Sequence, residues 1–77
     1  MSKKNISRAV RSAMESYISD MEDQEITDLY ELVIKEVEAP MLNCVMHHTF
    51  NNQSKAAAML GLSRGTLRKK LRKYRLL

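Results

Sequence analysis

Apolar residues recur at spacings of three and four in the first part of the chain. This spacing is typical of one face of an amphipathic helix, and it predicts a helix over roughly residues 6–20. The members of this line are Ile6, Val10, Ala13, Met14, Tyr17, Ile18 and Met21. The segment DMEDQEI that follows is short, acidic and without periodicity, so we expect a loop there.

A second, longer apolar segment begins after Asp28, which has Glu31 three residues later, as at many helix starts. Helical spacing continues to about His48 or Thr49, through Leu29, Leu32, Val33, Val37, Met41, Cys44, Val45 and His48. Leu32 and Ile34 lie off the main line, so this helix is apolar on more than one side and needs more than one partner. We therefore expect a homodimer in which long helices cross.

Pro40 lies inside this second segment. Proline removes a backbone donor and clashes with the preceding turn, which costs about 3 kcal/mol in a helix interior. Either the helix kinks near Ala39, or a new helix begins with Pro40 in its first turn. The apolar pattern keeps its phase across Pro40, which favours the kink.

The last part of the chain predicts two short helices. Asn52 is a suitable N-cap for a helix over residues 53–60, and Gly61 can end it in the left-handed conformation. Ser63 can cap a second helix over residues 64–74. The apolar line of that helix is Leu67, Leu71 and Tyr74. Two short helices separated by about three residues that include glycine are typical of a helix-turn-helix.

Two small residues bear on this motif. Ala57 would let the two short helices approach closely, although an ordinary helical hairpin uses the same small residues. Gly65 would cost about 0.5–1 kcal/mol relative to alanine inside a helix. It would let the backbone approach a phosphate or a base edge closely, or it is simply a tolerated exposed glycine.

Charge divides the chain in two. The net charge of the 77 residues is +4, but residues 1–50 carry 5 basic and 9 acidic side chains, whereas residues 51–77 carry 8 basic and no acidic ones. We therefore expect one compact domain with a helical dimerisation core, 1–50, and a helix-turn-helix unit, 51–77. No acidic residue follows Glu38, so local ion pairs cannot satisfy the cations of the last helix. A solvated basic face is the ordinary alternative, but a basic second helix in this motif favours nucleic acid.

Composition excludes several classes of protein. A single cysteine, Cys44, rules out a disulfide scaffold and favours a reducing, cytoplasmic compartment. Two glycines and one proline argue against an all-β fold, so the expected class is all-α with four helices. The sequence shows no apolar run of a signal peptide or of a membrane span.

The only cluster that resembles a metal site is Cys44, His47 and His48. Structural zinc needs four ligands and the chain has no other Cys or His, so core and surface roles are favoured. We expect no metal, no cofactor, no small-molecule substrate and no catalysis.

The stretch NNQSKAAAMLGLSRGTLRKKLRKY strongly resembles the C-terminal helix-turn-helix of the Fis family, the factor for inversion stimulation. The resemblance continues upstream through DLYELVIKEVEAPML, which includes Pro40, and reaches back to about Ile6. A related version is the C-terminal DNA-binding domain of NtrC-type activators. Because this chain carries no ATPase domain, a free-standing protein of the bacterial nucleoid fits better.

The resemblance implies an intertwined homodimer with two helix-turn-helix units on one side. In the family, the recognition helices are too close for adjacent major grooves of straight B-DNA, so double-stranded DNA must bend. The family pattern implies DNA contacts at Asn52, Ser54, Lys55, Ser63, Arg64, Thr66, Arg68, Lys69, Arg72 and Lys73. Arg64 is the candidate for guanine readout, Ser63 and Lys69 are candidates to approach bases, and the others are expected mainly to hold phosphate.

The chain departs from the family at two places. Ser63 stands where the family often has asparagine, so base preference at that position is open. The enteric proteins have an N-terminal β-hairpin arm that activates invertases, and only Met1–Asn5 precedes the first predicted helix here. We expect DNA binding and bending without invertase activation.

The leading function is therefore a dimeric, weakly sequence-specific DNA-bending protein that organises the nucleoid and regulates transcription. A helical protein-interaction adaptor with a basic tail is the alternative from another class. An RNA-binding protein is disfavoured, because the basic region has no aromatic residue for base stacking beyond Tyr74.

Overall fold

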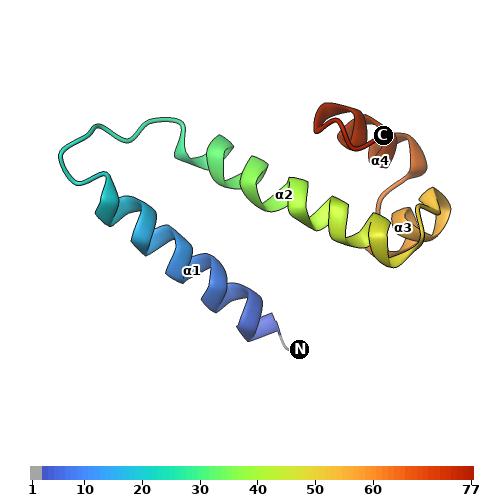
Figure 1. Ribbon diagram of the computed structural model, residues 1–77, viewed down its shortest axis with the longest axis horizontal. Coiled ribbons are helices and arrows are strands. Elements are labelled where there is room, and N and C mark those ends of the chain that lie inside the picture. The colour runs from blue at the N-terminus through green and yellow to red at the C-terminus, as the bar shows by residue number, and fades with distance from the viewer. Residues whose placement is uncertain (1–2) are drawn as a thin grey trace.

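The computed structural model describes residues 3–77, which form four helices and no strand. In chain order these are α1 (Lys3–Asp20), α2 (Leu29–His48), α3 (Gln53–Leu60) and α4 (Arg64–Lys73). Figure 1 shows α1 and α2 as two long limbs joined by a loop, with α3 and α4 gathered at the C-terminal end of α2. The prediction of an all-α fold with four helices is confirmed.

The first two helices lie close to their predicted bounds. α1 begins at Lys3, earlier than the first apolar residue of its line, and contributes no buried side chain. α2 begins directly after Asp28, but the Asp28 side chain makes no capping hydrogen bond. Its backbone is left-handed, with φ 54° and ψ 30°, so Asp28 marks the helix start through its backbone conformation.

α2 continues through Pro40 as one helix of 20 residues. The alternative in which a new helix begins at Pro40 is therefore excluded. A proline leaves one carbonyl of the preceding turn without its helical partner, yet the apolar residues on both sides of Pro40 keep their common phase.

The helix-turn-helix is built as its turn residues predict. The Asn52 side-chain oxygen accepts a hydrogen bond from the Lys55 backbone N–H at 3.0 Å, and the Ser63 hydroxyl accepts one from the Thr66 N–H at 3.1 Å. Gly61 ends α3 with φ 73°. The last helix is one residue shorter than expected, because Tyr74 is its C-cap.

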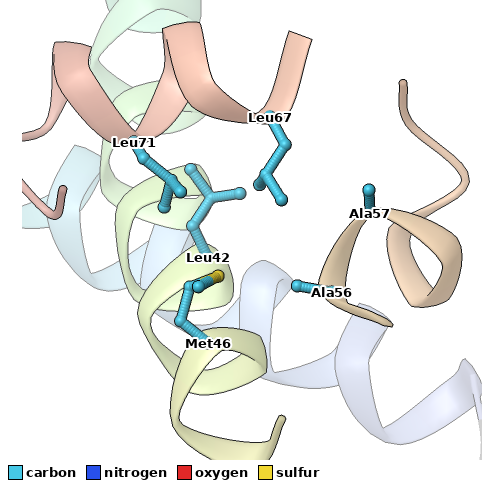
Figure 2. Close-up of a cluster of buried hydrophobic side chains, with 6 residues drawn as sticks. All are labelled: Leu42, Met46, Ala56, Ala57, Leu67 and Leu71. Carbon is cyan, nitrogen blue, oxygen red and sulfur yellow. The ribbon is translucent and has the colours of Figure 1, made fainter. Parts of the chain in front are cut away.

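The hydrophobic core lies where three helices meet (Figure 2). It consists of Leu42 and Met46 from α2, Ala56 and Ala57 from α3, and Leu67 and Leu71 from α4. The three leucines are 0 % exposed, so the C-terminal part of α2 forms the third wall of the helix-turn-helix. Burying such side chains contributes about 1.5–3 kcal/mol each.

The turn between α2 and α3 fixes the entry to the motif. Buried Thr49 donates from its hydroxyl to the Val45 carbonyl at 3.0 Å, which closes the end of α2. Phe50 and Asn51 follow with left-handed φ angles of 53° and 63°, and the Asn51 N–H returns to the Met46 carbonyl. These bonds hold two non-glycine residues in a conformation that costs them about 1–2 kcal/mol each.

Candidate nucleic-acid interface

The two faces of α4 have opposite chemistry. Leu67 and Leu71 are fully buried against α2 and α3. Gly65, Lys69 and Arg72 follow at spacings of four and three and are exposed, so they form the outward face of the helix. This arrangement presents the cations of α4 to solvent while its leucines anchor the helix.

All ten residues of the predicted interface are exposed in the structure. They fall into three groups: the start of α3, the start of α4, and the exposed side of α4. The groups are Asn52, Ser54 and Lys55; Ser63, Arg64 and Thr66; and Arg68, Lys69, Arg72 and Lys73. The fold thus leaves each of them accessible to a large ligand.

The polar residues at the helix starts already have intrachain partners. Besides accepting from the Thr66 N–H, Ser63 donates from its hydroxyl to Thr66 Oγ1 at 2.9 Å. Asn52 likewise caps α3. These bonds fix the backbone at two helix N-termini, whose free N–H groups attract anions such as phosphate.

Arg68 has a partner that the sequence pattern does not reveal. Its guanidinium Nη1 donates to Gln53 Oε1 at 2.9 Å, and this bond joins α4 to the first turn of α3. Gln53 was not among the predicted site residues. The two residues are 15 positions apart on different helices, so no local spacing relates them.

The expectation that the cations of α4 lack ion pairs is wrong for Lys70. Its Nζ lies 2.8 Å from Glu38 Oε2, and the Tyr74 hydroxyl donates to Glu38 Oε1 at 2.5 Å. Both bonds are half-buried and connect α4 to α2. Lys70 lies outside the predicted interface set, and its carboxylate partner is 32 residues earlier in the chain, beyond the reach of any helical pattern.

This contact shifts two titrations in opposite directions. Hydrogen bonds from Lys70 and then Tyr74 lower the pKa of Glu38 below the ordinary value of 4.5, and they outweigh the partial burial that would raise it. The hydrogen bond to Glu38 raises the pKa of Tyr74 above 10.0. Glu38 is therefore the charged member of the contact at neutral pH, and Tyr74 is the neutral donor.

The other cations of α4 face solvent. Within residues 3–77, Lys70–Glu38 is the one ion pair, and Arg64, Lys69 and Arg72 make no side-chain hydrogen bond. Lys73 lies with its Nζ 5.3 Å from the centre of the Tyr74 ring. The uncompensated positive charge of α4 can attract a polyanion.

A separate apolar groove lies between the two long helices. It holds about 660 Å³ and is lined by residues that include Val10, Met14 and Tyr17 of α1 and Val33, Val37 and Met41 of α2. Val37 and Met41 remain 43 % and 44 % exposed. The chain therefore leaves the inner faces of α1 and α2 uncovered.

Two further observations limit the kinds of site present. Across the described part of the chain, no three His, Cys, Asp or Glu side chains are placed to hold a metal ion, and Cys44 is a free, exposed thiol. None of the helices in residues 3–77 combines the length and the apolar character needed to cross a bilayer.

Comparison with known proteins agrees with this geometry. A family model described as bacterial regulatory protein, Fis family, matches residues 33–74, from α2 through the end of α4. A protein named DNA-binding protein Fis from Histophilus somni is 54 % identical over 66 residues, which cover 86 % of this chain and 67 % of the relative.

Two other relatives bear the same name. The protein from Aliivibrio fischeri strain MJ11 is 49 % identical over 74 residues, covering 96 % of this chain and 76 % of its own. The protein from Actinobacillus succinogenes is 52 % identical over 71 residues, covering 92 % and 72 % respectively. The helix-turn-helix, the core beneath it and these matches together show that the chain belongs to the Fis family of bacterial regulatory proteins.

Proposed function

We propose that this protein is a dimeric DNA-binding and DNA-bending protein of the bacterial nucleoid that regulates transcription with weak sequence specificity. The observation that carries the proposal is the outward face of α4, where Lys69 and Arg72 have no partner in the described chain. The name of the relatives, DNA-binding protein Fis, supports the same ligand. We propose neither a catalytic role nor a cofactor.

The proposed dimer is formed by a second copy of the chain in the groove between α1 and α2. No side chain of α1 is buried within one chain, and α2 keeps exposed apolar residues on the groove side. A 77-residue chain with so small a core gains stability by covering this surface. Residues 1–50 are then mainly the dimerisation core, and residues 51–77 the DNA-binding unit.

Within the proposed interface, Arg64 is assigned to guanine, whose O6 and N7 a guanidinium can bind together. Ser63 and Lys69 are assigned to positions near base edges. The remaining residues are assigned to phosphate: Asn52, Ser54, Lys55, Thr66, Arg68, Arg72 and Lys73. Since Ser63 is held in its cap, its contribution to base choice is limited to what a capped hydroxyl can still donate or accept.

The bending part of the proposal concerns two recognition helices in one dimer. If they are too close for adjacent major grooves of straight DNA, then the energy of bending contributes to the choice of site. The absence of invertase activation stays a prediction, and an inversion assay with normal activity would contradict it.

The test is footprinting combined with a circular-permutation gel shift on the purified protein. We expect protected sites, a mobility that depends on the position of the site, and affinity for duplex DNA that falls steeply with salt, by about 0.9 in log–log slope per neutralised phosphate. Salt-insensitive or absent duplex binding, with retention on acidic proteins, would instead support the interaction adaptor.

A further inference from the structure

One carboxylate fastens the C-terminal half of α4 to the long helix α2. Glu38 uses each oxygen once, one for the Lys70 ammonium at 2.8 Å and one for the Tyr74 hydroxyl at 2.5 Å. Its side chain is 15 % exposed and that of Lys70 32 %, so water competes only in part for these bonds. No buried side-chain polar atom among residues 3–77 lacks a partner.

These bonds add direction to a contact that is otherwise made of leucines. Glu38 lies one helical turn before Leu42, while Lys70 and Tyr74 flank Leu71, and both leucines are fully buried in the shared core. Leucine packing excludes water but tolerates small rotations of a helix about its axis. Two hydrogen bonds to a single carboxylate require a defined donor geometry, so they restrict that rotation.

The same contact removes one cation from the basic helix. Lys70 is the residue of α4 whose charge is compensated within the described chain, whereas its neighbour Lys69 and the nearby Arg72 face solvent without a partner. A lysine that is paired at 2.8 Å has little to gain from a phosphate, because it must first give up its carboxylate.

We propose that Glu38 is a positioning residue: through Lys70 and Tyr74 it sets the rotation of α4 relative to the dimerisation helix, and it withholds Lys70 from DNA. The inference rests on the proposed function. Because α2 belongs to the dimerisation core, this contact transmits the geometry of the dimer axis to each recognition helix. It thereby controls the separation of the two helices, on which bending and site choice depend.

The first test separates Lys70 from the cations that bind phosphate. The double variant Glu38→Gln with Lys70→Met replaces the ion pair with neutral groups, and Arg72→Met is the matched control on the exposed face. We expect the salt slope of duplex binding to be unchanged in the double variant and to fall by about 0.9 per protomer in the control. An equal fall in both would show that Lys70 neutralises a phosphate, and would overturn the proposal.

The second test addresses positioning through a charge exchange. Lys70→Glu alone should lower the ratio of specific to non-specific DNA affinity about tenfold or more and alter the bend, as expected when a hydrogen bond to a charged group is lost. Adding Glu38→Lys restores an ion pair of opposite polarity with the same net charge as the original protein. Recovery of the ratio and of the bend supports the proposal, and their failure to recover overturns it.

Tyr74→Phe covers the case in which Lys70→Glu does not fold, as judged by circular dichroism. It keeps the Lys70 pair and the ring packing, and removes one of the two bonds to Glu38. We expect a reduced affinity ratio with an unchanged salt slope, and an unchanged ratio and bend would overturn the proposal. If the original protein itself shows no salt-dependent duplex binding, it is the proposed function that fails.

Discussion

At the scale of single residues, the turns of this protein depend on local chemistry. Gly61 takes φ 73°, a conformation that glycine adopts without strain, and Asn52 and Ser63 cap the two helices of the motif. Each of these roles involves atoms no more than a few positions apart. Such roles can be predicted from residue type and spacing, and all three were.

Gly65→Ala distinguishes the two interpretations of that glycine. A Cβ built on Gly65 has no neighbouring atom within 4 Å, so we expect the variant to unfold at higher temperature, with a gain of about 0.5–1 kcal/mol. If DNA approaches the backbone closely there, the added methyl group should weaken binding. Thermal unfolding and duplex titration on the same preparation measure both effects. Increased stability with unchanged affinity would identify Gly65 as a tolerated exposed glycine.

Arg64→Ala and Arg72→Ala should weaken DNA binding in different ways. Loss of the Arg64 guanidinium should reduce discrimination at one base position by about 1–3 kcal/mol. Loss of Arg72 should weaken all sequences similarly and reduce the salt slope by about one per contact. Affinities for a set of single-base variants of one site, measured at several salt concentrations, test both. Equal effects of the two variants would remove the readout role of Arg64.

At the scale of elements, the contact between α2 and α4 joins parts of the chain that sequence patterns treat separately. The expected division at residue 50 places Glu38 in the dimerisation core and Lys70 in the DNA-binding unit. The structure links them through a carboxylate and through the leucines beneath it. This link makes the orientation of α4 dependent on α2.

The acid sensitivity of the fold should reflect this contact. Because the pKa of Glu38 is lower in the folded chain than its ordinary value of 4.5, the ionised carboxylate stabilises the fold above that pH. This contribution is lost as the pH falls through the lowered pKa. Urea unfolding between pH 7 and pH 3 should show a loss of stability that is smaller in Glu38→Gln. An identical pH profile in both proteins would mean that Glu38 does not stabilise the fold by its charge.

At the scale of the whole molecule, the extents of 44 × 28 × 17 Å reflect two long helices that are not packed into one core. The compact part lies at one end, where α3 and α4 meet the end of α2 (Figure 1). The remainder of α2 and all of α1 gain their stability, in our proposal, from the second copy of the chain.

Val37→Lys should disrupt the proposed dimer. It places a charge in the apolar groove, where its burial against a partner is unfavourable. We expect sedimentation to show a shift towards monomer, together with loss of helical signal and weaker DNA binding. Tyr30→Lys is the control, because Tyr30 lies on the same helix, is 79 % exposed and does not line the groove. A Val37→Lys protein that remains dimeric would contradict the proposed interface.

The sequence by itself determined the four helices, the turn at Gly61 and the exposed basic face of α4. These features follow from hydrogen bonds and side-chain spacings that repeat within four residues. The use of an αL backbone rather than a side-chain cap at Asp28 depended on φ and ψ, which residue type only biases. The Arg68–Gln53 bond and the pairing of Lys70 with Glu38 were decided only by the tertiary structure. Partners 15 and 32 residues apart meet because the core leucines bring their helices together, and no local periodicity records that meeting.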